Sequence, residues 1–369
     1  MHDHLQEAIN LATSVRYSGD PGKPLDRENK LESSHIHYQF NENGLRLSAN
    51  MTPSIYQVLE DVCLRLKIDP GSVLAFVRAS PEIQAGCYSA DTCDCLISFS
   101  SALIQLMDED ELAFVIGHEL GHFLLGHGAD MTNSDSTIES LLHQRGKEIS
   151  ADRLGMLACP SKDAAFRALI KTTAGLDSKY LRFDIGAYLD QIRSNANSAI
   201  SANEGSTHPS LVMRCRALLW FSMSSEYTSL AGGAGGESIV RVDERLAKDM
   251  QKFVDGPVHQ RIADAREAMH IWLMASAAIR DGSFDRSEQS LIANELGQDL
   301  LDKMLDLFSG CGRDEVNAIV REKLIDAVEY YQSIAPREYE VERKKIEEGI
   351  AEKFFQKDFA PYVLSLVMQ

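Results

Sequence analysis

The chain has 369 residues, of which 44% are hydrophobic and 25% are charged, as is typical of a folded globular protein rather than a disordered one. Its 55 acidic and 37 basic residues give a formal net charge of −18, which argues against a protein that binds the phosphate backbone of nucleic acids. The same negative charge disfavours docking to an anionic membrane surface.

The N-terminal residues 1–4 show neither the positive region nor the apolar region of a secretory signal. The most apolar stretch, residues 112–125, is short and carries His118, Glu119 and His122, so we expect no membrane span. The 7 cysteines are odd in number and irregularly spaced, which is typical of a reducing compartment. The sequence therefore predicts a cytoplasmic protein.

Residues 1–49 are predicted to form an N-terminal extension with a short amphipathic stretch at 4–15. Alternating apolar residues between 36 and 47, around Asn43-Gly44, predict a hairpin. The spacing of apolar residues predicts a helix over 55–66, and short apolar runs at 73–77 and 96–99 predict strands. From residue 108 to about 219 the pattern is mostly helical.

A glycine-rich segment at 231–236 is typical of a linker, which we place at 231–242. It separates a predicted domain at 50–230 from one at 243–369. In the second predicted domain the pattern of apolar residues is helical almost throughout, with short breaks at 255–257, 281–282 and 309–312. The expected architecture is an α+β domain followed by an all-α domain.

The sequence H-E-L-G-H at residues 118–122 matches the H-E-x-x-H motif. Two histidines four positions apart on a helix lie one above the other, so both imidazoles can bind one metal ion. Asp108 and Glu111 resemble a capping box that would begin this helix. Zinc fits because it accepts two imidazoles and a carboxylate and keeps one position open, where Glu119 can act as general base on a bound water.

The third ligand decides the subclass of such a site. The metzincin pattern requires Gly at 125 and His at 128, where this chain has Leu125 and Gly128, so that class is excluded. Glu148 lies in a later helical stretch and is the candidate third ligand, against the alternative of a surface acid. Asp152, one turn further on, would accept a hydrogen bond from a ligating histidine and fix its tautomer. His127 and His143 fit no ligand spacing and are interpreted as helix residues, and His35 and His37 are interpreted as structural.

Three motifs occur together in order: H-E-L-G-H at 118–122, E-I-S-A-D-R-L-G at 148–155, and T-H-P-S at 207–210 followed by Arg214. In this combination the sequence resembles the HtpX-like zinc metallopeptidases, the gluzincin group that includes the Ste and Oma proteases. The resemblance implies a gluzincin-type domain that hydrolyses peptide bonds as a zinc-dependent metalloendopeptidase. It also implies one zinc ion per chain (Zn²⁺), with three ligands: His118, His122 and Glu148.

The same resemblance implies roles for three further residues. Glu119 would be the catalytic base, and His208 would help to stabilise the tetrahedral oxyanion, which a fixed hydrogen-bond donor can do. Arg214 matches the family arginine and is expected to pair with Asp152 or a nearby acid.

The substrate is expected to be a polypeptide in extended conformation that adds a strand near residues 84–99. Family members usually carry an Asn-Ala-Phe-like motif on that edge strand, and the equivalent residues here, 84–88, lack the Asn. Many relatives are membrane-anchored or exported, and because this sequence shows neither feature, a role in membrane-protein quality control is not carried over. Cys87, Cys93 and Cys95 cluster in this region, and packing is favoured over a redox or zinc-thiolate switch.

In the C-terminal part, an apolar helix at 268–279 and the residues 281–288 that follow it resemble TerB-like helical domains over a short stretch. An EF-hand is excluded because Gly282 is misplaced and the twelfth ligand is missing. A helix–helix turn in which Asp285 and Glu288 form a capping box competes with a metal site here. Two alternatives to a peptidase stay open: a proteolytically silent, metal-bound protein whose helical domain binds a protein partner, and a stress-response metal-binding module.

Overall fold

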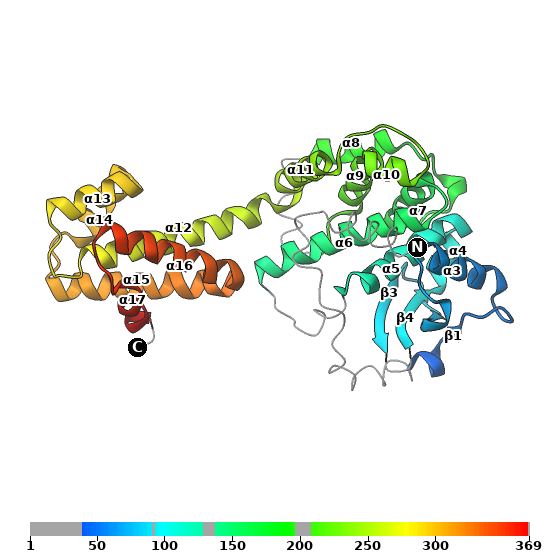
Figure 1. The fold of residues 1–369 in the computed structure, drawn as a ribbon, viewed down its shortest axis with the longest axis horizontal. Helices are drawn as coiled ribbons and strands as arrows, with labels where there is room; N and C mark the ends of the chain where they lie inside the picture. Colours follow the sequence, from blue (N-terminus) through cyan, green and yellow to red (C-terminus); the bar gives the residue numbers. More distant parts are fainter. Residues whose placement is uncertain (1–38, 91–92, 128–136, 196–207, 368–369) are drawn as a thin grey trace. The chain divides into compact units, whose positions relative to one another are not determined.

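The computed structural model describes residues 39–90, 93–127, 137–195 and 208–367 (Figure 1). The chain divides into two compact units, Met1–Asp135 with Leu141–Gly256, and Ser136–Ser140 with Pro257–Gln369. The amphipathic stretch predicted at 4–15 lies outside the described residues.

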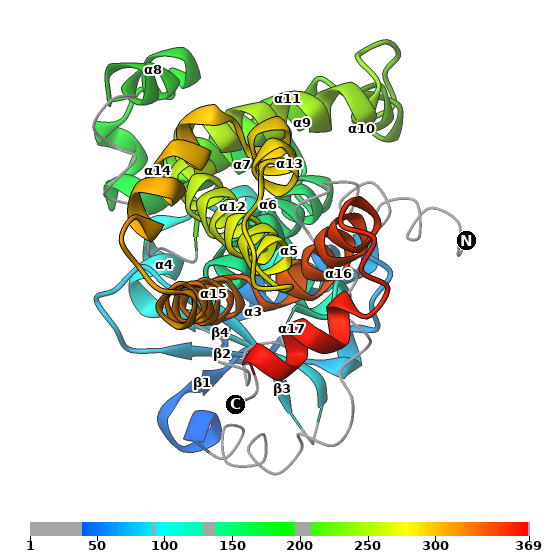
Figure 2. The same cartoon turned by 90° about the vertical axis from the view of Figure 1, so that its left-hand side faces the viewer.

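A small mixed sheet lies in the first unit, with strands β1 (Leu45–Arg46), β2 (Val73–Arg78), β3 (Ala85–Ala90) and β4 (Cys93–Ser100). Their order is β1-β2-β4-β3, with β2 parallel to β4 and both outer strands antiparallel to their neighbours (Figure 2). The strands predicted at 73–77 and 96–99 are confirmed. Strand β3 pairs with β4 and is one of the two edge strands of this sheet, the other being β1.

The hairpin predicted around residues 36–47 is wrong at residues 39–43, which form a helical turn, and residues 36–38 lie outside the described residues. The Phe40 side chain is buried and its ring lies 5.8 Å from that of Phe76, so the turn is held by packing on the sheet. The Gly44 N–H donates to the Phe40 carbonyl at 2.9 Å, and only the next two residues pair with β2. Tertiary packing of one aromatic ring has overridden the alternating pattern.

Side chains alternate along the sheet, so each strand contributes to two different environments. Ala75, Ile97 and Phe99 face the main core, which they share with buried residues of helices α3 (Pro53–Arg65) and α5 (Glu109–Leu124). On the opposite face, Phe76 and Leu96 form a small cluster with Phe40. The short helix α4 (Ser101–Leu106) follows β4 directly.

Helix α5 begins with the predicted capping box: the Glu111 N–H donates to Asp108 at 2.8 Å, and the Asp108 N–H donates to Glu111 at 2.9 Å. Two glycines on α5 allow close approach of α6 (Ile138–Ala158). A Cβ at Gly117 would lie 2.5 Å from the Ala158 Cβ, and one at Gly121 would lie 3.2 Å from the Ala151 Cα. The two helices that carry the H-E-x-x-H motif and Glu148 therefore meet backbone to backbone.

Further helices complete the first unit: α7 (Lys162–Ala174), α8 (Ile185–Asn195), α9 (Leu211–Ser222), α10 (Ser225–Leu230) and α11 (Ile239–Met250). Short 3₁₀ turns occur at Pro70–Ser72 and Ser178–Tyr180. Helix α9, which carries Arg214, packs against α7, α8 and α11.

The first unit extends beyond the linker predicted at 231–242 and ends at Gly256. Buried ion pairs explain this: Arg145 of α6 lies 2.6 Å from Asp255, and Arg153 lies 2.6 Å from Asp243 of α11. The break predicted at 255–257 is instead a π-helical turn, Gln251–Asp255, that runs into α12 (Gly256–Ala278). A wide turn of this kind accommodates a proline that an α-helical interior would not.

We expect the Asp255→Ala variant to lose about 3–5 kcal/mol of unfolding free energy, because it removes a carboxylate that lies 2.6 Å from the fully buried Arg145 guanidinium. Glu244→Ala, which removes an exposed carboxylate from α11, is the matched control and should change stability little. Denaturant unfolding of the full chain measures both. Equal stability of the two variants would contradict the expectation.

The described elements of the second unit are helices: α12, α13 (Arg286–Leu296), α14 (Gln298–Phe308), α15 (Arg313–Ile334), α16 (Pro336–Lys353) and α17 (Phe359–Val367). Asp285 and Glu288 form the predicted capping box, with bonds of 3.1 and 2.8 Å. Asp281 accepts both hydrogen bonds of Ser283 at 2.8 Å. These contacts explain residues 281–288 as a helix–helix turn rather than as a metal site. Among the described residues, no helix is long and apolar enough to cross a membrane.

Candidate metal centre and active site

Helices α5 and α6 bring together the three residues predicted to bind a metal. The Nε2 atoms of His118 and His122 lie 3.0 Å apart. The Glu148 carboxylate lies 3.6 Å from the His118 Nε2 through Oε2 and 3.4 Å from the His122 Nε2 through Oε1. In the part of the chain that the structure describes, this is the one group of His, Cys, Asp and Glu side chains placed to hold a metal ion.

These spacings fit a tetrahedral zinc site. Two ligand atoms that each lie about 2.0–2.1 Å from a tetrahedral zinc are roughly 3.3–3.4 Å from each other. The distance between the two histidine nitrogens, 3.0 Å, and the distances from them to different oxygens of Glu148, 3.4 and 3.6 Å, scatter around that value. Two imidazoles and one carboxylate are also the donor set of catalytic zinc sites that keep a fourth position for water or substrate.

Asp152 and Arg214 lie directly behind the cluster. The Asp152 Oδ1 lies 3.0 Å from the His118 Nδ1, so it can hold the Nε2 of His118 free for the metal. Arg214 donates to Asp152 through Nε at 2.8 Å and through Nη2 at 2.6 Å, and its Nη1 lies 3.0 Å from Glu148. One guanidinium therefore orients both acids and compensates their charge inside the protein.

The electrostatics of the cluster keep its acids ionised. Burial alone would raise the pKa of Glu148, but Arg214 beside it holds that pKa well below its usual value. The pKa of Asp152 is lowered against its own burial in the same way, by Arg214 and by the hydrogen bond with His118. Burial, and then the neighbouring His118, lower the pKa of His122 to about 3, so its imidazole is neutral, as a metal ligand must be.

Glu119 follows the first candidate ligand on α5 and is 7% exposed. Burial raises the pKa of its carboxyl to about 7, with opposing contributions from His118, Arg214 and His208. A general base works best when its pKa lies near the operating pH. The site thus contains a carboxyl group suited to take up and release a proton at neutral pH.

His208 precedes α9 and lies at the mouth of the cluster. Its Nε2 is 3.3 Å from the Glu148 Oε1, and its side chain is 60% exposed. Of the seven residues predicted for the site, it is therefore the one most open to solvent and to a bound substrate. The structure brings all seven into one place.

His127, interpreted from the sequence as a helix residue without ligand spacing, lies next to this site. It is buried, and its Nδ1 lies 2.9 Å from the Nδ1 of His122. When His122 binds a metal through Nε2, its Nδ1 carries the proton and donates to His127, which must then be the acceptor. Burial lowers the pKa of His127 to about 2, which keeps the ring neutral for that role.

We expect His127→Ala to bind zinc roughly 10- to 100-fold more weakly, because the hydrogen-bond partner of a ligating histidine sets its tautomer and orientation. His127→Gln, whose amide oxygen can accept the same hydrogen bond, should recover part of the affinity. Competition with a zinc-binding dye measures both variants. Equal zinc affinity of wild type and His127→Ala would show that His127 only fills space.

The cysteines near the edge strand support the packing interpretation. Cys95 is fully buried in the main core, and Cys87 packs against the same core from β3. Their sulfur atoms lie 3.3 Å apart as free thiols. Neither residue belongs to the metal cluster, and the side chain of Cys93 lies outside the described residues.

Comparison with known proteins agrees with this geometry. Residues 50–142 and 135–220 match the model of Peptidase family M48. Over 223 residues the chain is 26% identical to the plastoglobule-localized metallopeptidase 48, chloroplastic, of Arabidopsis thaliana, a match that covers 53% of this chain and 64% of the relative. No solved structure matches the chain. Residues 50–220 of this chain are therefore similar to Peptidase family M48, and the relative that the chain matches is a metallopeptidase.

Proposed function

We propose that the chain is a zinc-dependent metalloendopeptidase of the HtpX-like, gluzincin type that cleaves protein substrates. The observation that carries the proposal is the buried cluster of His118, His122 and Glu148, with Glu119 next to it on the same helix. The family match and the metallopeptidase relative favour this activity over a proteolytically silent, metal-bound protein.

Zinc bound at this cluster would supply Lewis-acid polarisation of the scissile carbonyl and lower the pKa of a water molecule. His118, His122 and Glu148 would hold the ion. Glu119 would accept the proton of the attacking water and pass it to the leaving amine, a task that suits a carboxyl with a pKa of about 7. His208, exposed beside Glu148, would donate a hydrogen bond to the oxyanion.

Arg214 and Asp152 would act through the ligands rather than on the substrate. Their paired hydrogen bonds fix the ring of His118 and the carboxylate of Glu148 in the absence of any substrate contact. A site held rigidly in this way needs little reorganisation during the reaction.

The substrate would bind in extended conformation along β3. That strand lies at the edge of the sheet and is in contact with α5, the helix that carries the H-E-x-x-H motif. Addition of a strand to a sheet edge gives main-chain hydrogen bonds that do not depend on the substrate's sequence. A cytoplasmic location, and a protein partner for the TerB-like helical part, remain proposals that depend on the sequence alone.

Metal removal tests the proposed activity. We expect the purified full chain to contain about one zinc per molecule, to cleave fluorescently labelled casein, to lose that cleavage after treatment with 1,10-phenanthroline, and to regain it with added zinc. Cleavage that continues at the same rate in the metal-free protein would contradict a metallopeptidase.

A further inference from the structure

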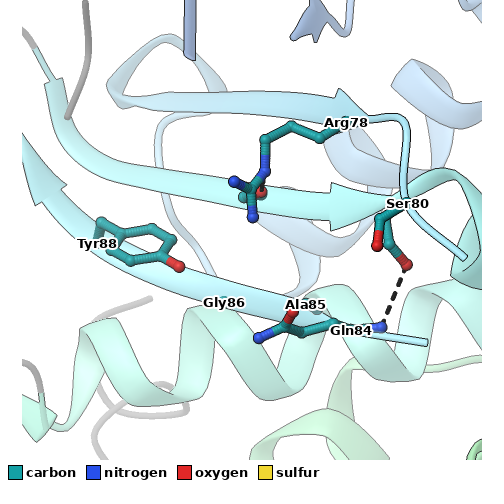
Figure 3. Close-up of a pocket in the computed structure, with 8 residues that line it drawn as sticks. Arg78, Ser80, Gln84, Ala85, Gly86 and Tyr88 are labelled. Carbon is teal, nitrogen blue, oxygen red and sulfur yellow. Dashed lines mark hydrogen bonds between the residues drawn. The ribbon is translucent and has the colours of Figure 1, made fainter. Parts of the chain in front are cut away.

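A polar hollow lies on the face of the sheet that points away from α3 and α5, at the ends of β2 and β4 and the beginning of β3 (Figure 3). It is small, with a cavity volume of about 20 Å³, and it is partly open to solvent. Its lining includes six residues with distinct roles: Arg78, Gln84, Gly86, Tyr88, Ser98 and Ser100. The metal cluster does not contribute to this hollow.

Arg78 is held in place over the hollow without a carboxylate partner. Its Nε donates to the Ser98 hydroxyl at 3.2 Å, and its guanidinium lies 5.0 Å from the centre of the Phe40 ring. Among the described residues, no Asp or Glu forms an ion pair with it, and it is the one charged residue in the lining. A fixed guanidinium with terminal N–H groups left over is well suited to a planar, bidentate anion.

The other polar groups of the hollow can donate hydrogen bonds as well. Ser98 and Ser100 are buried, and their oxygens already accept N–H groups: Ser98 from Arg78, Ser100 from Gln84 and Leu103. Within the described structure their hydroxyl protons have no acceptor. Figure 3 shows the Tyr88 hydroxyl and the Gln84 amide on either side of Gly86. Several donors and one positive charge therefore converge where no acidic side chain stands.

Gly86 connects this hollow with the free edge of the sheet. It lies on β3, and a Cβ at its position would be 3.0 Å from the Tyr88 hydroxyl oxygen. Because glycine has no side chain, the Tyr88 ring can lie over Gly86, which brings its hydroxyl group to the hollow. In a strand added to β3, every second side chain would point to this same face of the sheet.

We propose that this hollow binds a carboxylate, supplied by a Glu or Asp side chain of a peptide paired with β3. The peptide as the source rests on the proposed peptidase function, whereas the carboxylate chemistry rests only on the donors that line the hollow. A free dicarboxylate is the other source of the same chemistry. In a peptidase, the hollow would select acidic residues at one position of the substrate.

Calorimetric binding to the full-length, zinc-loaded Glu119→Gln variant tests the site without relying on hydrolysis. The probes are an acetylated, amidated pentapeptide, Val-Thr-Glu-Thr-Val, its Gln counterpart, and glutarate. We expect the Glu peptide to bind roughly 10- to 100-fold more tightly than the Gln peptide, as one charge-assisted pair allows. Arg78→Gln should abolish that difference, and Arg46→Gln, which removes an exposed charge from β1, should preserve it.

Glutarate binding that depends on Arg78, without a difference between the two peptides, would support the carboxylate site and assign it to a free small molecule. Failure of all three probes to depend on Arg78 would overturn the site. Tyr88→Phe serves as a second variant, because its ring can keep its place beside Phe40 while one donor is lost. It should weaken carboxylate binding several-fold, and an unchanged affinity would also count against the proposal. Either of these results would rule out only the carboxylate site, because casein cleavage by the wild type tests the proposed peptidase function separately.

Discussion

Replacing Glu119 by Gln is expected to reduce peptide-bond hydrolysis at least roughly 10²-fold and to leave zinc bound, because the amide keeps the shape of the side chain but cannot take up a proton. The carboxyl lies buried, with a pKa raised to about 7, next to one of the three side chains proposed to bind the metal. The measurement is the rate of casein cleavage, together with the zinc content of the same preparation.

Glu109→Gln is the matched control for this change. Glu109 lies in the first turn of the same helix but is exposed and outside the metal cluster, so its loss should leave both cleavage and zinc content near the wild-type values. If Glu119→Gln cleaved as fast as Glu109→Gln, Glu119 would not be the base, and proton transfer would have to proceed through another group.

The second large effect is expected from Glu148→Gln. This change replaces the anionic ligand by a neutral amide and removes the carboxylate that Arg214 contacts at 3.0 Å. Zinc affinity should fall by more than the roughly 10- to 100-fold typical of losing a hydrogen-bond partner of a ligand, because a ligand itself is altered. Zinc competition titrations of the full chain measure the loss.

Asp163→Asn, at the exposed beginning of α7, controls for removal of one negative charge. It should bind zinc as the wild type does. If Glu148→Gln retained wild-type zinc affinity, Glu148 would be a buried ion-pair residue rather than a ligand, and a third ligand would have to be sought elsewhere.

Much of the candidate metal centre could be predicted, because the relative positions of its residues depend on short-range spacing along single helices. The two histidines four positions apart, and the capping box at Asp108 and Glu111, are set by helix geometry alone. Glu148 and Asp152 are again four apart, so once one of them faces the cluster the other does too. The glycines at 117 and 121, which let α5 and α6 meet closely, were present in the sequence, but their partners on α6 were not visible there.

His127 could not be found by ligand spacing, because its position depends on how α5 ends. The helix ends at Leu124, and Gly126 has a φ of +67°, which turns the chain so that His127 returns to the ring of His122. Glycine favours such a left-handed turn, but the sequence does not say where the next side chain will then point.

Contacts between distant segments account for the other differences. The end of the first unit depends on ion pairs such as Arg145 with Asp255, which join residues far apart in the sequence. The glycine-rich segment at 231–236 does not indicate these pairs. The helical turn at 39–43 depends on the packing of Phe40 on Phe76. Patterns of apolar residues are a better guide to which helices and strands form than to which other elements each of them packs against.

The central claim is tested most directly by counting new peptide N-termini across the proteome of cells that express the wild-type chain or Glu119→Gln. We predict that a set of new N-termini appears only with the wild type, while both proteins carry zinc. Identical sets of N-termini in the two kinds of cell, with zinc bound in both proteins, would contradict the assignment of this chain as a peptidase that works through Glu119.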